Sequence, residues 1–268
     1  MHDVGIYENL ILGIHFLLLK KCKIFDEKTI VTCYTDRSMR INVRKHERRG
    51  YQSIKMSNIL EKQFLKQRND FEKSCVERDK KYHFPQGVIF ETDIAYAKDK
   101  NKAHRLDRYR PKGKETQILP VIINVHGGGL LLGNKEFNKY FCALLSKKGF
   151  LVYSMEYRLI PDCTFFDQLR DIFLAMDFVK EHAAADGGDL SHVYLVGDSG
   201  GACLATYANA IQNSKKIAKA AGVKPSELKV HALGLISGMF YTTKFDKIGL
   251  FLSKYLYGKP VSYTHLRA

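Results

Sequence analysis

The chain has 268 residues, of which 45% are hydrophobic, and it carries a formal net charge of +15. A chain of this length can bury a sizeable core, and α/β folds often reach this size in one domain. Its six cysteines show no C-x-x-C and no paired spacing, which argues against a disulfide framework and indicates a reducing compartment. We therefore expect a cytoplasmic protein.

Two segments near the start could indicate other classes of protein. The apolar run at residues 10–19 is too short to span a bilayer, and it lacks a basic leader and a small-residue cleavage site. The basic patch at residues 37–49 could bind nucleic acid or an anionic membrane surface. We interpret it as a solvated face, because no aromatic platform or nucleic-acid module accompanies it. The sequence thus predicts no nucleic-acid partner and no stable membrane insertion.

Hydrophobic periodicity divides the rest of the chain into alternating strands and helices. In chain order we expect a helix at 53–82, strands at 88–96, 104–110 and 119–125, a helix at 137–147, a strand at 150–155, a helix at 165–181, a strand at 193–196 with a helix after it, a lysine-rich surface segment at 215–229, a strand at 230–236 and a helix at 244–257. The first two strands should form an antiparallel pair. The later alternation predicts an α/β protein whose mostly parallel sheet is covered by helices on both faces.

The strand at 193–196 runs into G-D-S-G-G at residues 197–201 and then into an apolar helix. A G-x-S-x-G motif between a strand and a helix is typical of a nucleophilic serine, because the sharp, strained turn leaves room only for glycine two residues before and two residues after the serine. Ser199 would stand at the carboxyl end of the strand and at the N-terminus of the helix, which favours developing negative charge. We interpret Ser199 as a nucleophile and Asp198 as a side chain that stabilises the turn.

A second glycine motif, H-G-G-G at residues 126–129, follows the strand at 119–125. Glycines after a strand let the backbone turn several N–H groups toward one point, as a tetrahedral oxyanion requires. Either motif alone could be a tight glycine turn. Two motifs in this order, each at a strand end, favour a catalytic site.

These motifs resemble those of hormone-sensitive-lipase-like α/β-hydrolases, a branch of carboxylesterases and lipases marked by H-G-G-G before G-D-S-x-G. The stretches L-D-R-Y-R-P, Y-R-L-I-P and G-G-D-L also match, and the similarity covers residues 88–238. The resemblance implies the α/β-hydrolase fold and a small-molecule ester substrate. It implies Ser199 as the nucleophile and the amides of Gly128, Gly129 and Gly200 as the oxyanion hole.

The same resemblance implies roles for residues around the two motifs. His126 and Gly127 would support the oxyanion loop, and Tyr157 and Arg158 would hold it from beneath. Gly200 stands where the family usually has alanine. We expect this difference to be tolerated, because the oxyanion hole uses only the amide of that residue.

A serine nucleophile needs a base, and the base needs an orienting carboxylate. In this fold the chain order is serine, acid, histidine, so the in-order candidates after Ser199 are Asp246 and His265. The family, however, draws its acid and base from loops after two further strands, and one expected strand follows the nucleophile helix here. We therefore expect a C-terminally truncated hydrolase, inactive as given, with a catalytic core at 86–260 and a non-native tail at 261–268.

Residues 1–85 are expected to form a partly helical extension. Relatives carry a helical cap over the pocket at this place, and the alternative is a helix that only buries its own apolar stripe. The scattered histidines have no metal-ligand spacing, so we expect no metal and no cofactor. The leading hypothesis is an esterase of small or medium acyl esters, and the alternative is a non-catalytic binding protein with the same pocket. A further acid and histidine at two later strand ends would favour the enzyme.

Overall fold

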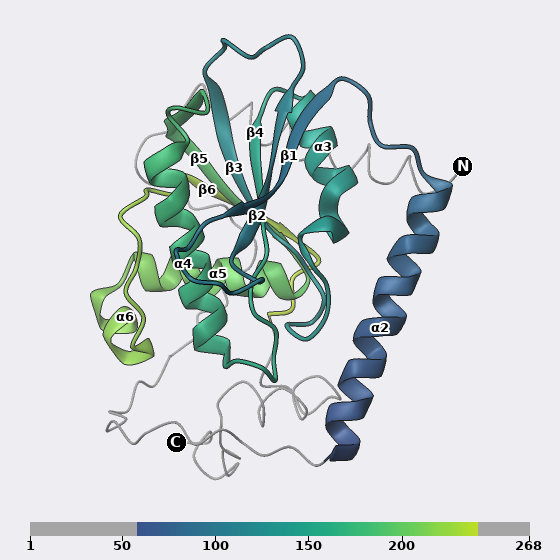
Figure 1. Cartoon of the computed structure of the whole chain (residues 1–268). Helices are drawn as coiled ribbons and strands as arrows, with labels where there is room; N and C mark the ends of the chain where they lie inside the picture. The colour runs from purple at the N-terminus through teal and green to yellow at the C-terminus, as the bar shows by residue number, and fades with distance from the viewer. Residues whose placement is uncertain (1–57, 241–268) are drawn as a thin grey trace.

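A mixed sheet forms the centre of the computed structural model, which describes residues 58–240 (Figure 1). Its strands are β1 (Val88–Ala95), β2 (Arg105–Pro111), β3 (Leu119–Val125), β4 (Leu151–Met155), β5 (Gly188–Asp198) and β6 (Ala232–Ile236). They lie in the order β1-β2-β4-β3-β5-β6. β1 and β2 pair antiparallel, as do β2 and β4, whereas β4, β3, β5 and β6 pair in parallel. The prediction of an α/β fold with a mostly parallel sheet is confirmed.

Helices cover both faces of the sheet (Figure 1). In chain order they are α2 (Asn58–Lys81), the 3₁₀ helix η1 (Lys135–Asn138), α3 (Lys139–Lys147), α4 (Phe165–His182), α5 (Gly200–Gln212) and α6 (Lys215–Ala221). α4 begins at a capping box, in which the Thr164 hydroxyl accepts a hydrogen bond from the Asp167 amide and the Asp167 carboxylate accepts one from the Thr164 amide. The prediction of a helix at 165–181 is therefore confirmed to within a residue at its end.

Two elements differ from the expectation drawn from the sequence. β5 begins at Gly188, well before the apolar run at 193–196, because its polar first half also pairs with β3 across a register shift. The lysine-rich segment at 215–229 begins with the helix α6, which Ser214 caps and left-handed Gly222 ends. The helix expected at 244–257 lies outside the described residues.

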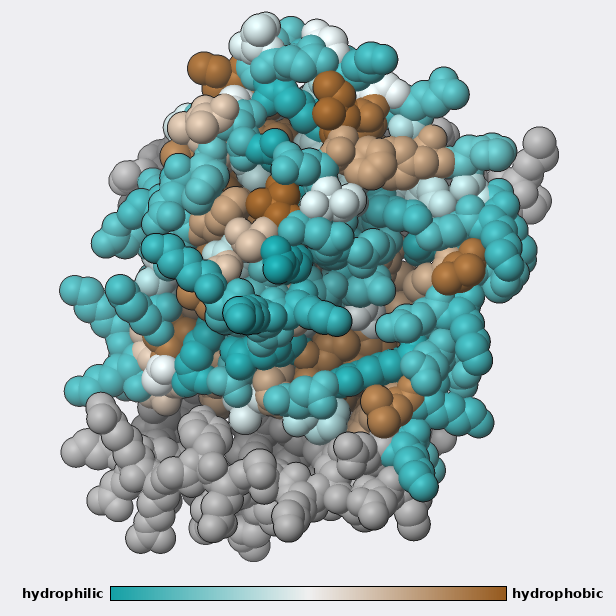
Figure 2. Space-filling view, viewed as in Figure 1, coloured by the Kyte–Doolittle hydropathy of each residue, from teal (hydrophilic) through white to brown (hydrophobic). Residues whose placement is uncertain are grey.

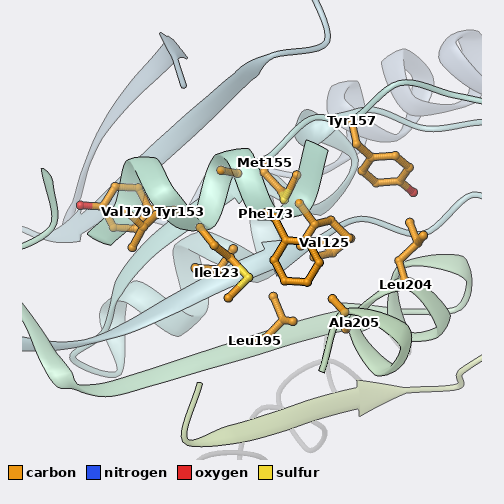
Figure 3. Close-up of a cluster of buried hydrophobic side chains, with 14 of the residues drawn as sticks. Ile123, Val125, Tyr153, Met155, Tyr157, Phe173, Val179, Leu195, Leu204 and Ala205 are labelled. Atoms are coloured by element: carbon orange, nitrogen blue, oxygen red, sulfur yellow. The ribbon is translucent and has the colours of Figure 1, made fainter. Parts of the chain in front are cut away.

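Side-chain alternation along the strands builds two cores. Val121, Ile123 and Val125 of β3 point to the face that carries α4 and α5, where the buried residues include Phe173, Met176, Leu204 and Ala205. Figure 3 shows Ile123 and Val125 of the sheet meeting Phe173, Leu204 and Ala205 of the two helices. Ile122, on the opposite face of β3, packs with Phe141, Cys142 and Leu145 of α3. β3 is thus buried on both faces, as its mostly apolar sequence predicts.

α2 lies along one flank of the molecule, outside the sheet (Figure 1). It contacts the start of α3 and η1, where the Phe71 and Phe137 rings lie 4.9 Å apart and Arg78 donates a 2.7 Å hydrogen bond to the Phe137 carbonyl. Its outer face exposes Leu65 and Val76. On the face seen in Figure 2, hydrophobic side chains lie in small separate groups among hydrophilic ones.

β1 is an outermost strand of the sheet, and a bulge interrupts it. Its register with β2 shifts between Glu91 and Ile94, and Asp93 adopts a left-handed φ of 60°. The Asp93 amide is held by the buried carboxylate of Asp107 at 2.9 Å.

The chain crosses the sheet in a way that places two loops side by side. From β3 it passes through α3 to β4 on one side, and from β4 it crosses through α4 to β5 on the other side of β3. The carboxyl ends of β3 and β5 are therefore neighbours, with Val125 paired to Gly197. Sites in open α/β sheets form at such switch points.

Candidate active site

Ser199 occupies a strained turn between β5 and α5. Its φ of 48° and ψ of −113° lie outside the regions that a residue with a side chain ordinarily adopts. Glycine is required beside it, because a Cβ on Gly201 would overlap the Val125 carbonyl oxygen and one on Gly197 would lie 2.6 Å from the Gly201 carbonyl carbon. The turn therefore has the geometry that the G-D-S-G-G motif predicts.

The end of β6 holds the backbone of this turn. The Ser199 amide donates to the Ile236 carbonyl at 2.8 Å, and the Met239 amide donates to the Ser199 carbonyl at 3.1 Å. Ser237, between the two, also has a left-handed φ of 47°. The segment after β6 thus fixes the serine backbone through bonds that leave its side chain unused.

The glycine loop after β3 lies against this turn. Gly128, Gly129 and Leu130 have successive left-handed φ values of 119°, 62° and 72°. An ideal Cβ on Gly200 would lie 3.1 Å from the Gly129 nitrogen and 3.0 Å from the Leu130 nitrogen. Among residues 58–240, the amides of Gly128, Gly129 and Gly200 donate no hydrogen bond.

Gly200, the position at which this sequence differs from the family pattern, lies in a narrow space against the glycine loop. The methyl group of an alanine would stand closer to the Gly129 and Leu130 nitrogens than ordinary van der Waals contact, so the glycine loop would have to move by a few tenths of an ångström.

Asp198 joins the serine turn to the glycine loop. Its Oδ1 accepts hydrogen bonds from the Gly127 amide at 2.9 Å and from the Asn138 side-chain amide at 2.7 Å. A Cβ on Gly127 would overlap this carboxylate, which explains why glycine follows His126. The carboxylate therefore acts on the backbone around the turn, as expected for a turn-stabilising side chain.

His126 is fully buried and lies beneath the loop. Its Nδ1 donates to the Gly127 carbonyl at 2.7 Å, its Nε2 lies 3.1 Å from Glu156 Oε1, and its ring stacks on Tyr157 with the centroids 4.2 Å apart. The Tyr157 hydroxyl donates to the His126 carbonyl at 2.8 Å. Burial disfavours the imidazolium, but the hydrogen bond and charge of Glu156 outweigh it and raise the pKa of His126.

The side chain of Arg158, which the resemblance placed beneath the glycine loop, hydrogen-bonds to α4 and to no residue of that loop among the described residues. The Arg158 amide and guanidinium donate to Asp171, which is completely buried on α4. Gln168, one turn earlier, donates to the carbonyls of both Leu130 and Arg158 at 2.9 Å. Gln168 and Asp171 are polar residues within the apolar stripe of a helix, and that interruption was the available signal.

No histidine of residues 58–240 hydrogen-bonds to Ser199; each that forms a hydrogen bond there has other partners. The sequence candidates Asp246 and His265 lie outside the described residues. The structure between residues 58 and 240 shows no group of histidines, cysteines and carboxylates that could hold a metal ion. No helix in the same region is long and apolar enough to cross a membrane.

Comparison with known proteins gives a consistent result. A family model described as BD-FAE matches residues 106–247. A probable isoprenylcysteine alpha-carbonyl methylesterase of Arabidopsis thaliana is 31% identical over 157 residues, which cover 57% of this chain and 33% of that protein. A versiconal hemiacetal acetate esterase of Dothistroma septosporum is 31% identical over 141 residues, which cover 52% of this chain and 40% of that protein. The chain thus spans well under half the length of these curated relatives.

Among solved structures, esterase B from Lactobacillus rhamnosis is similar with a TM-score of 0.68 and 27% sequence identity. The match covers 75% of this chain and 68% of that one. The likeness is to an esterase of known structure, and it supports the same fold.

Proposed function

The chain belongs to the BD-FAE family, its fold is that of the α/β-hydrolase esterases, and from this premise we propose that the protein is a serine-dependent carboxylic ester hydrolase. The Arabidopsis and Dothistroma relatives are both named for ester hydrolysis, the first of a methyl ester and the second of an acetate. We take a carboxylic ester of small or medium acyl length as the substrate class of this chain.

The proposed reaction passes through an acyl-serine. The Ser199 hydroxyl oxygen attacks the ester carbonyl, and the resulting oxyanion accepts hydrogen bonds from the amides of Gly128, Gly129 and Gly200. The collapse of this intermediate expels the alcohol, and water then releases the acid by the same route. His126 and Gly127 support the loop that carries two of the three donors.

The observation that carries the proposal is the pairing of a strained serine with unused amides. Backbone N–H groups in the interior of proteins almost always find a partner. Here the buried Gly200 and the half-buried Gly128 and Gly129 have amides without a partner among the described residues, on the two motifs that meet at Ser199. An oxyanion is the group that such donors fit.

The proposal also includes weak turnover for residues 1–268 themselves. A serine hydroxyl without a base stays protonated at neutral pH and is a weak nucleophile. Within residues 58–240 no histidine lies in hydrogen-bond contact with Ser199, so the base would have to come from elsewhere, with His265 as the in-order candidate for the base and Asp246 for the acid that orients it. His265→Ala tests this: if turnover of wild-type protein is strong and falls with that substitution, the pair completes the site.

The experiment for the main proposal is covalent labelling with a fluorophosphonate probe, alongside hydrolysis of p-nitrophenyl acetate. We expect the probe to label Ser199 covalently, and we expect the Ser199→Ala substitution to abolish this labelling. Ser191→Ala is the matched control, because Ser191 is exposed at the opposite end of β5. Labelling that persists in Ser199→Ala would place the nucleophile elsewhere. If the protein binds an ester but does not hydrolyse it and is not labelled by the probe, the result would instead support the non-catalytic binding protein.

A further inference from the structure

We propose that Arg68, on α2, is a positioning residue for the oxyanion loop; this rests on the proposed function. The Arg68 guanidinium donates from Nε to the Leu131 carbonyl at 2.9 Å, from Nη2 to the Ile160 carbonyl at 2.9 Å, and from Nη1 to Asp162 at 2.7 Å. Its side chain is 18% exposed. A single cation from the flanking helix thus joins the glycine loop to the segment after β4.

The bond to Leu131 reaches the oxyanion donors through two rigid peptide planes. Because a peptide is planar, fixing the Leu131 carbonyl also fixes the direction of the Leu132 N–H. That N–H donates to the Gly128 carbonyl at 2.9 Å. The Gly128 carbonyl belongs to the same peptide plane as the Gly129 N–H, which then points the opposite way. The guanidinium therefore sets the orientation of a proposed oxyanion donor two peptides away.

The charge of Arg68 acts in the same direction as its geometry. A cation that donates to a carbonyl polarises the peptide and makes its N–H a stronger donor, and chains of hydrogen bonds strengthen one another. The chain from Arg68 to Leu132 to Gly128 ends at the free Gly129 N–H, where an oxyanion would form. The loop needs such support from outside, since Leu130, a residue with a side chain, holds a left-handed φ of 72°.

The inner side of the loop is already held by other residues. The Leu130 carbonyl accepts hydrogen bonds from the Ile160 amide at 3.0 Å and from the Gln168 side chain at 2.9 Å. The next carbonyl, Leu131, points to Arg68. The two sets of hydrogen bonds restrain neighbouring peptides and meet at Ile160, whose amide binds Leu130 and whose carbonyl accepts from Arg68. Arg68 is the partner supplied by the helix outside the sheet. α2 then contributes a positioning residue to the site, in addition to packing against η1 and α3.

The test compares Arg68→Ala with Arg78→Ala in residues 1–268. Arg78 is on the same helix and donates to the Phe137 carbonyl, away from the glycine loop. Because residues 1–268 are expected to turn over only weakly, kcat for p-nitrophenyl acetate is measured as the rate above that of Ser199→Ala. We expect Arg68→Ala to lower this serine-dependent rate to the Ser199→Ala level, since misplacing a catalytic group by an ångström costs about 10²-fold. Arg78→Ala should stay near wild type, and Arg68→Lys and added guanidinium should each restore part of the rate.

Hydrogen exchange at the Leu132 amide gives a readout independent of turnover. It should accelerate in Arg68→Ala and not in Arg78→Ala, whereas Asp162→Asn, which keeps the bond to Leu131, should leave it unchanged. Equal exchange and equal kcat in the Arg68 and Arg78 variants would overturn the inference. If wild type and Ser199→Ala hydrolyse the ester equally, the proposed function fails, and the exchange measurement still decides whether Arg68 holds the loop.

Discussion

Asp198 offers a direct test of how the two motifs are held together. Asp198→Ala would leave two donors without their acceptor, the Gly127 amide and the Asn138 side-chain amide. A hydrogen bond to a charged group contributes about 1.5–3 kcal/mol. Two such bonds give about 3–6 kcal/mol, and the half-buried position of Asp198 lowers this by solvent screening. We expect a loss of about 2–4 kcal/mol in the free energy of unfolding.

Urea denaturation followed by circular dichroism measures this loss. With a slope of about 2 kcal/mol per molar urea, the midpoint should fall by roughly 1–2 M. Asp198→Asn keeps an acceptor oxygen, and neutral hydrogen bonds contribute about 1 kcal/mol each, so its midpoint should fall less.

The matched control is Asp189→Ala. The Asp189 carboxylate accepts hydrogen bonds from the amide and hydroxyl of Ser191, and its other oxygen lies 2.6 Å from His192 Nδ1. Ser191 is exposed, so water can replace the carboxylate there. We expect this variant to lose under about 1 kcal/mol. If Asp198→Ala is no less stable than Asp189→Ala, the bridge between the motifs does not stabilise the fold and the reasoning is wrong.

Three further predictions concern the surroundings of the site. Gly200→Ala should lower kcat by about 3- to 10-fold, because its methyl group displaces the Gly129 amide by a few tenths of an ångström; an unchanged kcat would show that the loop yields without loss. Asp171→Ala should cost about 3–5 kcal/mol in urea denaturation, because it leaves a guanidinium and an imidazole without their buried acceptor; a loss under about 1 kcal/mol would contradict this. The pKa of His126 is raised in the folded protein, so its ion pair with Glu156 stabilises the fold at pH values below the pKa of histidine in the unfolded chain. This stability is lost as the pH rises through the pKa of the folded state. Glu156→Gln should therefore destabilise the protein more at about pH 5.5 than at about pH 8.5, and equal losses would refute that ion pair.

The fold and the two motifs could be predicted because their signals are local. The bounds of β3 follow from one mostly apolar run that ends at the H-G-G-G motif, and the structure confirms them. The turn at Ser199 needs small residues at positions that the backbone itself dictates, so the glycines mark it in the sequence. Such a pattern depends on a few neighbouring residues, so it can be recognised without knowing the three-dimensional structure of the rest of the chain.

The support of the site could not be predicted, because its partners are distant and are mostly backbone atoms. Arg68 binds carbonyls that lie 63 and 92 residues further along the chain, and a carbonyl carries no mark in the sequence. Gln168 acts in the same way on Leu130. α6 was missed for another reason, since lysine-rich segments suggest solvated surface even where a serine cap starts a short helix.

The bulge in β1 has a consequence for how copies of this protein meet. An outermost strand that exposes Ile89 and Phe90 would ordinarily be a template for edge-to-edge pairing and aggregation. Asp93 breaks the regular spacing of N–H and C=O groups along that edge, and its own N–H is turned inward to Asp107. A second chain could match only a few residues before losing register. The bulge therefore disfavours edge-to-edge pairing of β1 with a second chain, and deleting one residue of the bulge would remove this effect.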